Sequence, residues 1–142
     1  MSDTIEGRCL CGAVRITVRG LSQEISACHC EMCMRWSGGI QFGVDAPAGE
    51  TEVSGPVEVY RSSAIAERAW CGECGSALWL RDIGDGAPYE LVPGLFPNAG
   101  GARLVREVYA DRAPEGYALA GDHRRVSAAD YARENPVVEE TG

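Results

Sequence analysis

The chain has 142 residues, 45% of them apolar, and a net charge of −8; this length suits one domain that buries roughly two-thirds of its unfolded surface. The acidic charge, without a block of Lys or Arg, argues against nucleic acid as a partner. No apolar stretch approaches membrane-spanning length, and the polar, acidic start lacks the layout of a signal peptide. We therefore expect a cytoplasmic protein with no membrane partner, in a reducing compartment where disulfides are rare. The oligomeric state stays open.

Short segments of alternating apolar and polar residues recur along the chain. With 18 glycines and turn residues in most gaps, this pattern favours short strands over long helices. The predicted strands are residues 13–18, 40–44, 57–60, 77–80, 89–92 and 104–109. We predict one mainly β domain over residues 1–142, with a core of about 6–133.

Two short helices are also predicted. Residues 31–36 form a turn or two after the middle group of cysteines. Residues 127–133 begin at Ser127 as the N-cap, with Asp130 three residues later, and stop before Pro136. The acidic tail of residues 134–142 is expected to fray.

Seven cysteines fall into three short groups, and none is isolated. The groups are Cys9 and Cys11 (C-x-C), Cys28, Cys30 and Cys33 (C-x-C-x-x-C), and Cys71 and Cys74 (C-x-x-C). An odd number, a reducing compartment and the strain of a bridge within C-x-C oppose a disulfide framework. Buried hydrophobic cysteines would not cluster in this way, and the last pair lacks the βαβ setting of a redox motif. Thiolates at these spacings suit tetrahedral zinc, so we predict metal sites.

The segment CGECG at residues 71–75 is the most specific zinc signal. In such a knuckle, backbone N–H groups turn toward the first sulfur, and Gly75 tolerates the left-handed conformation that closes the turn. A knuckle supplies two ligands and needs a second pair. Spacing alone allows either Cys9 with Cys11, or Cys30 with Cys33, as that pair.

Three strings carry a resemblance to a known family. They are RCLCGAV at residues 8–14, CHCEMCMRWSG at 28–38, and RAWCGECGS at 68–76 with Ser63 before it. Together they resemble the glutathione-dependent formaldehyde-activating enzyme family, also called the centromere protein V-like group. The likeness covers roughly residues 6–117.

The resemblance implies a mainly β fold, the β-tent of short antiparallel sheets with one or two short helices, and two Zn²⁺ ions per chain. One set of ligands would form a closed structural site: Cys9, Cys11, Cys71 and Cys74. The other set would hold a catalytic zinc whose fourth position is left to water or substrate: Cys28, Cys30 and Cys33. Closed zinc sites stabilise a fold and open ones react.

The open site predicts thiol chemistry. Three thiolates make zinc a modest Lewis acid, but they suit the binding of a fourth thiolate, whose pKa falls. Our hypothesis is a carbon–sulfur lyase resembling S-(hydroxymethyl)glutathione synthase, with a glutathione-like thiol and formaldehyde or a similar small aldehyde as its partners. The alternatives are a non-catalytic zinc scaffold that binds another protein, and a cysteine-based sensor or metal buffer.

Residues that follow the middle cysteines have expected roles at this site, each with a plainer alternative. Arg35 is predicted to bind a carboxylate of the thiol; the alternative is a solvated arginine on a short helix. Ser37 and Gly38 are similar to the family's Ser-Gly pair, where backbone lies close to a ligand. A simple turn explains those two residues as well.

Arg68 is expected near the same site, because the resemblance puts an arginine there; the alternative is an outward-facing strand residue. His29 lies between two ligands and either completes the second zinc site or shuttles a proton. Side chains that flank ligands usually point away from the metal, which disfavours ligation by His29. Glu107 and His123 match no motif and receive no role.

Overall fold

The computed structural model describes residues 3–136 and contains eleven strands, two α-helices and four short 3₁₀-helices. This composition confirms the predicted mainly β fold class. The chain divides into two compact units: unit 1 contains residues 3–25 and 43–103, and unit 2 contains residues 26–42 and 104–136. Within the described part of the chain, no helix has the length and apolarity that a membrane crossing requires. The expectation of a single domain stays a prediction.

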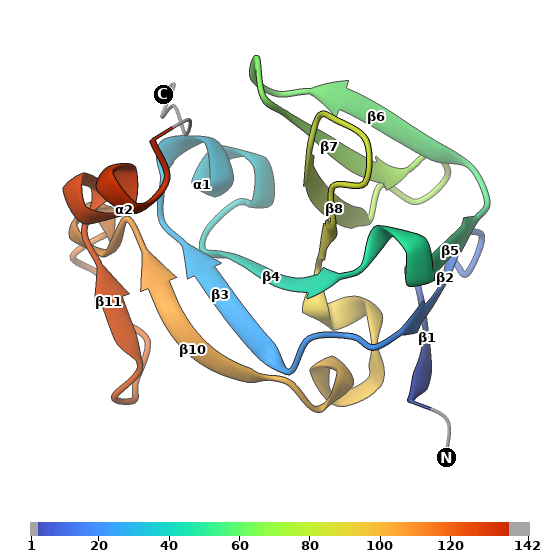
Figure 1. The fold of residues 1–142 in the computed structure, drawn as a ribbon, viewed down its shortest axis with the longest axis horizontal. Coiled ribbons are helices and arrows are strands. Elements are labelled where there is room, and N and C mark those ends of the chain that lie inside the picture. Colours follow the sequence, from blue (N-terminus) through green and yellow to red (C-terminus); the bar gives the residue numbers. More distant parts are fainter. Residues whose placement is uncertain (1–2, 137–142) are drawn as a thin grey trace. The chain divides into compact units, whose positions relative to one another are not determined.

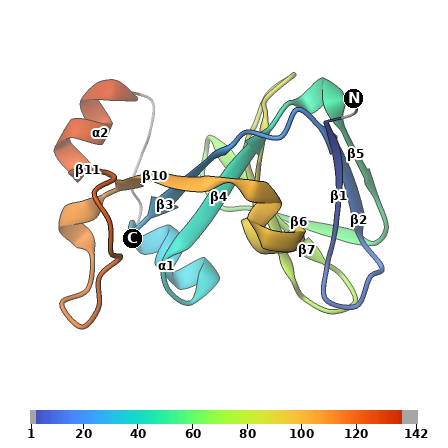
Figure 2. The same cartoon turned by 90° about the horizontal axis from the view of Figure 1, so that it is seen from below.

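Unit 1 is built from two groups of antiparallel strands, in the orders β1-β2-β5 and β4-β9-β8-β7-β6. Figure 2 shows the three strands of the first group side by side. The strands are β1 (Thr4–Arg8), β2 (Arg15–Arg19), β4 (Gln41–Ala46, of which the first two residues belong to unit 2), β5 (Thr51–Ser54), β6 (Val57–Arg61), β7 (Ala66–Cys71), β8 (Ala77–Asp82) and β9 (Tyr89–Leu91).

Strand β2 shows how the alternating pattern builds the core of unit 1. Ile16 and Val18 are fully buried, whereas Arg15 and Thr17 lie on the opposite face, as the period of two in a strand requires. The strand begins at Arg15 rather than at residue 13, because the preceding residues form the turn that follows the first two cysteines. Val44, Leu78 and Leu91 of unit 1 are also buried.

Unit 2 contains three neighbouring strands in the order β11-β10-β3 together with both α-helices (Figure 1). Its elements are β3 (Glu24–Cys28, of which the first two residues belong to unit 1), α1 (Glu31–Ser37), β10 (Arg103–Val108, beginning one residue before the unit), β11 (Arg124–Val126) and α2 (Ala128–Glu134). The pair β10–β11 is parallel. The buried core consists of Cys30, Cys33, Val108, Tyr109 and Val126.

Short 3₁₀-helices connect several of these elements. They are η1 (Ala48–Glu50), η2 (Pro93–Leu95) and η3 (Pro97–Gly101) in unit 1, and η4 (Ala110–Arg112) in unit 2. Tyr109, before η4, has a left-handed backbone with φ of 55°. Strand β10 therefore ends at Val108, one residue earlier than predicted.

Helix α1 is confirmed at its predicted place and is one residue longer. Its N-cap is Cys30, whose Sγ accepts the N–H of Cys33 at 3.4 Å. The helix ends at Gly38, whose φ of 85° lies in the left-handed region that favours glycine. The N–H of Gly38 donates to the carbonyl of Met34 at 2.9 Å.

Helix α2 confirms the predicted cap, because the hydroxyl of Ser127 accepts the N–H of Asp130 at 3.1 Å. The last residue of the helix is Glu134, which the sequence placed in the fraying tail. Residues 137–142 of that predicted tail lie outside the described residues.

Five strands have no counterpart in the sequence-based prediction: β1, β3, β5, β7 and β11. Two of them show why. In β7 the buried residue Arg68, 3% exposed, interrupts the apolar pattern. Strand β11 has only three residues and exists through its parallel pairing with β10.

Candidate metal centres

Four cysteines of unit 1 come together in a group that we call the four-cysteine cluster: Cys9, Cys11, Cys71 and Cys74. Their Sγ atoms all lie within 4.8 Å of one another. The Sγ of Cys11 lies 3.6 Å from that of Cys9 and 3.9 Å from that of Cys71. A tetrahedral ion with metal–sulfur bonds of about 2.3 Å needs sulfurs about 3.8 Å apart, so the cluster fits a metal ion. The partner of the knuckle is thus the pair at residues 9 and 11.

The knuckle has the predicted local geometry. The Sγ of Cys71 accepts the N–H groups of Glu73 and Cys74, both at 3.4 Å. Gly75 has a φ of 81°, and its N–H donates to the carbonyl of Cys71 at 2.8 Å. Hydrogen bonds from the Ser76 side chain and backbone lower the pKa of Cys74 to about 5, which favours the thiolate that binds metals.

Cys9 is held in the same way. Its Sγ accepts the N–H of Val14 at 3.2 Å. Burial alone would raise the pKa of Cys9, but this hydrogen bond and those from the neighbouring thiols lower it overall. The loop from residue 9 to residue 14 therefore favours the thiolate form of Cys9.

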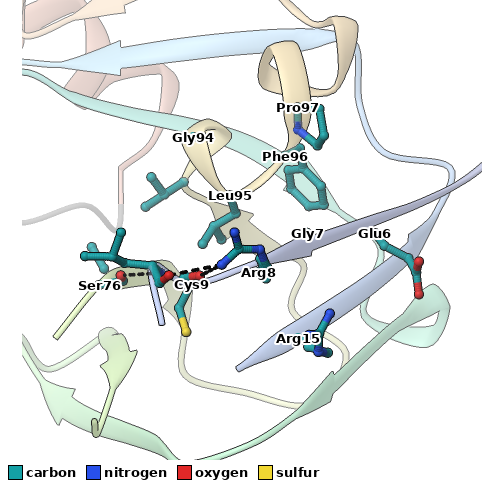
Figure 3. A pocket seen from close by; sticks show the side chains of 13 residues that line it. Glu6, Gly7, Arg8, Cys9, Arg15, Ser76, Gly94, Leu95, Phe96 and Pro97 are labelled. Carbon is teal, nitrogen blue, oxygen red and sulfur yellow. Dashed lines mark hydrogen bonds between the residues drawn. The ribbon is translucent and has the colours of Figure 1, made fainter. Parts of the chain in front are cut away.

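A hollow of about 650 Å³ lies beside the four-cysteine cluster within unit 1 (Figure 3). Arg8, Ser76 and Phe96 contribute to its wall. The Nη1 of Arg8 donates to the carbonyls of Cys9 at 3.1 Å and Leu10 at 3.0 Å. The N–H of Leu10 donates to the Ser76 hydroxyl at 3.0 Å. These hydrogen bonds from Arg8 and to Ser76 hold the loop that contains Cys9 and Cys11 in place.

Three cysteines of unit 2 form a second group, the three-cysteine cluster: Cys28, Cys30 and Cys33. The end of β3 and the first turn of α1 bring them together, and their Sγ atoms lie within 4.8 Å of one another. Across residues 3–136, no side chain of His, Asp or Glu joins this group. The three-cysteine cluster therefore offers three sulfurs to a metal ion.

Charge within the three-cysteine cluster also fits a cation. Hydrogen bonds from the thiols of Cys28 and Cys33 lower the pKa of Cys30, while hydrogen bonding to Cys30 and Cys33 raises the pKa of Cys28. Crowded sulfurs cannot all ionise without a positive charge among them. A metal ion would supply that charge and hold all three as thiolates.

The predicted neighbours Arg35, Ser37 and Gly38 have local structural roles. The side chain of Arg35 is 69% exposed and pairs with Glu31 on the same helix at 3.5 Å, as the solvated alternative describes. The Ser37 hydroxyl lies 2.8 Å from the carbonyl of Cys33 and 2.9 Å from that of Gly39. Gly38 closes α1 in a left-handed turn. Their proposed contacts with substrate stay predictions.

Arg68 lies on β7 in unit 1, where it is buried rather than facing outward. Its expected place near the second site stays a prediction. His29 is 2% exposed and does not join the three-cysteine cluster, because its Nε2 lies 2.7 Å from the Oε1 of Glu107. The proton-shuttle role of His29 also stays a prediction.

Glu107 is the centre of a buried polar network that the sequence did not predict. Glu107 is 4% exposed. Its carboxylate contacts the Nε2 atoms of His29 and His123, and the Nε of Arg125 lies 3.3 Å from its Oε2. Burial alone would raise the pKa of Glu107, but hydrogen bonds from His123 and His29 lower it overall. The chain's two histidines thus contact one carboxylate, across 78 and 16 residues. No local pattern could reveal contacts at that separation.

The network and the three-cysteine cluster lie against opposite faces of β10, because consecutive residues of a strand point to opposite faces. β3 ends at Cys28, and the N–H of the following residue, His29, donates to the carbonyl of Val108 at 3.1 Å. On β10, Val108 packs against the three-cysteine cluster, while the preceding residue Glu107 contacts His29. The network therefore lies on the face of β10 opposite to the three-cysteine cluster.

Comparisons with known proteins agree with this arrangement. A family model described as the glutathione-dependent formaldehyde-activating enzyme matches residues 4–112. An uncharacterized lyase of Schizosaccharomyces pombe is 30% identical over 117 residues, covering 81% of this chain and 85% of that protein. A protein of Halomonas elongata, named as a candidate glutathione-dependent formaldehyde-activating enzyme, is 31% identical over 88 residues, covering 55% of this chain and 56% of that protein. The crystal structure of a Rhodobacter sphaeroides protein shares the fold, with a TM-score of 0.54 and 18% identity over 85% of this chain and 99% of that one.

Proposed function

Because the chain belongs to the glutathione-dependent formaldehyde-activating enzyme family, we propose that it is a zinc-dependent carbon–sulfur lyase. In this proposal it joins glutathione, or a similar small thiol, to formaldehyde or a similar small aldehyde. The family, and the lyase name of the Schizosaccharomyces pombe relative, support the reaction class. Free thiols as substrate and ligands fit a reducing cytoplasm.

One observation carries the proposal: the three-cysteine cluster has three sulfurs and, in the part of the chain that the structure describes, no fourth protein ligand. The four-cysteine cluster is complete by the same measure. Tetrahedral zinc with three protein ligands keeps one position for a substrate, whereas four thiolates close the site. We therefore assign substrate binding to the three-cysteine cluster and structural support to the four-cysteine cluster.

Zinc at the three-cysteine cluster would supply a positive charge that lowers the pKa of an incoming thiol. The positions of the three cysteines are set by β3 and α1. Cys30 and Cys33 are fixed by the first turn of α1 and are buried, whereas Cys28 at the strand end is half-buried. We propose that the thiol approaches from the side of Cys28, the most exposed of the three cysteines.

The proposed reaction is balanced without an oxidant or reductant. The thiol sulfur bonds to the carbonyl carbon of formaldehyde, the carbonyl π bond opens, and the oxygen takes up the proton that the thiol loses. The product is an S-hydroxymethyl thiol. The reverse reaction breaks the carbon–sulfur bond, which makes the enzyme a lyase.

The test measures formaldehyde consumption by the zinc-loaded protein, with and without glutathione, for the wild type and for Cys30→Ala. We expect a glutathione-dependent rate in the wild type and only the spontaneous rate in the variant. Wild-type rates with glutathione that equal those of Cys30→Ala and of the reaction without protein would overturn the proposal. They would leave the non-catalytic scaffold as the better interpretation of the fold.

A further inference from the structure

Arg106, on β10 of unit 2, extends over the same face as the three-cysteine cluster. Its Nε donates to the hydroxyl of Ser26 at 2.8 Å. Ser26 and Cys28 are alternate residues of β3, so their side chains share a face. Val108, two residues beyond Arg106 on β10, packs against the cluster. Ser26, which the guanidinium contacts, is two strand positions from Cys28, roughly 7 Å along the strand.

The guanidinium of Arg106 is only partly used by the protein. The bond to Ser26 fixes its Nε, while the two terminal nitrogens make no hydrogen bond or ion pair with any residue in 3–136. The side chain is half-buried rather than fully solvated. Such a guanidinium offers two parallel N–H groups in a fixed fork, which is the geometry that a carboxylate accepts.

The positive charge of Arg106 is not paired with a carboxylate of the described residues, in contrast to that of its neighbour Arg124. Arg124 is directly opposite Arg106 in the parallel register of β10 and β11. One terminal nitrogen of Arg124 donates to Glu134 at 2.9 Å, which neutralises Arg124. Within residues 3–136, no carboxylate forms such an ion pair with Arg106.

An anionic thiol needs such a cation more than a neutral thiol does. The chain carries a net charge of −8, and three thiolates on a divalent ion leave a further negative charge at the cluster. A carboxylate brought to this face is repelled unless a fixed positive charge lies beside it.

We propose that Arg106, oriented by Ser26, binds a carboxylate of the incoming thiol and so selects carboxylated thiols at the three-cysteine cluster. This inference rests on the proposed function and names the residue that sets its substrate class. The predicted contact of Arg35 with a carboxylate is a separate expectation, and the side chain of Arg35 is 69% exposed and paired with Glu31. In this assignment Arg106 contacts substrate, and Ser26 is a positioning residue.

The test compares two probes that share one thiol: glutathione and its dimethyl ester, in which both carboxylates are blocked. Binding to the zinc-loaded protein is measured by isothermal titration calorimetry, which does not depend on turnover. The variants are Arg106→Gln, Arg106→Lys and Ser26→Ala. Arg103→Gln is the matched control, because this exposed arginine lies on the same strand at odd spacing, and so on the other face.

We expect the wild type and Arg103→Gln to bind glutathione at least tenfold more tightly than the ester. Arg106→Gln should weaken glutathione binding about 10- to 100-fold and leave ester binding within twofold, because a charged hydrogen-bonded pair is lost only with the acid. Arg106→Lys, which keeps the charge but not the fork, and Ser26→Ala should each give an intermediate loss. Thermal unfolding of each variant shows whether it is folded.

Three results would overturn this assignment. If Arg106→Gln weakens glutathione and ester equally, the arginine serves only to balance the charge of the cluster, and the proposed lyase function stands. If the wild type binds glutathione and its ester equally, no carboxylate is recognised, and the proposed lyase function again stands without this assignment. If the wild type binds neither thiol, the proposed function fails and this inference fails with it.

Discussion

The two cysteine clusters use similar ligands in different ways. The four-cysteine cluster joins loops that lie 60 residues apart at Cys11 and Cys71, whereas the three-cysteine cluster is contained in residues 28–33. A link across a long loop removes much more chain entropy than a link within one turn. The first cluster is therefore suited to stabilising unit 1, and the second fits the ligand-binding role that we propose for it.

The largest effect is expected from breaking the four-cysteine cluster with Cys71→Ala. Structural zinc contributes on the order of 10 kcal/mol to folding, about as much as the whole stability of an ordinary domain. We expect the variant to lose one metal ion and the cooperative unfolding of unit 1, measured by metal analysis and circular dichroism. An unfolding midpoint close to that of the wild type would contradict the structural role.

Cys30→Ala makes the matched change in the three-cysteine cluster. The variant should also lose one metal ion, but it should keep its fold, at a cost of about 1–3 kcal/mol from the lost N-cap and the buried sulfur. Its glutathione-dependent formaldehyde consumption should fall to the spontaneous rate. Loss of folding as complete as in Cys71→Ala would remove the distinction between the clusters.

Glu107→Gln tests the buried polar network on the face of β10 opposite to the three-cysteine cluster. The change removes the charge that His29, His123 and Arg125 share, and we expect the free energy of unfolding at pH 7 to fall by about 1–3 kcal/mol. The measurement is urea unfolding followed by circular dichroism. Glu115→Gln, at an exposed position of unit 2, is the control and should have no effect.

The lowered pKa of Glu107 predicts how the effect of the same variant on the unfolding free energy changes with pH. The folded-state pKa of Glu107 is below its ordinary value of 4.5, so its contribution is present above about pH 4.5 and is lost as the pH falls through the folded-state pKa. The difference in unfolding free energy between wild type and Glu107→Gln should therefore narrow when urea unfolding is repeated below pH 4.5. A difference that stays constant would show that the carboxylate charge is not the source of the stability.

The smallest effect is expected from Ser127→Ala, which removes the cap of α2. This helix packs Ala128 and Tyr131 against the core of unit 2, so the loss should be about 1 kcal/mol in urea unfolding. Ser127→Asp, which keeps an accepting oxygen, should retain most of the stability. If alanine and aspartate behave alike, the hydrogen bond to Asp130 contributes nothing measurable.

The sequence by itself determined the features that act over a few residues. The spacing in residues 71–75 predicted the knuckle, the cap at Ser127 predicted α2, and the alternation around Ile16 predicted β2. Each signal depends on hydrogen bonds or periodicity within one element, so neighbouring residues are sufficient to read it. The family resemblance, which rests on the same local strings, added the grouping of the cysteines.

Only the tertiary structure decided which distant side chains meet. Spacing left the knuckle with two candidate partner pairs, and the structure brings Cys9 and Cys11 to it. Glu107 had no assigned role until folding placed His29 and His123 on its carboxylate. Arg106 is one arginine among many in the sequence, and its contact with Ser26 spans 80 residues. Contacts of this kind depend on how strands pair, which leaves no pattern within either strand alone.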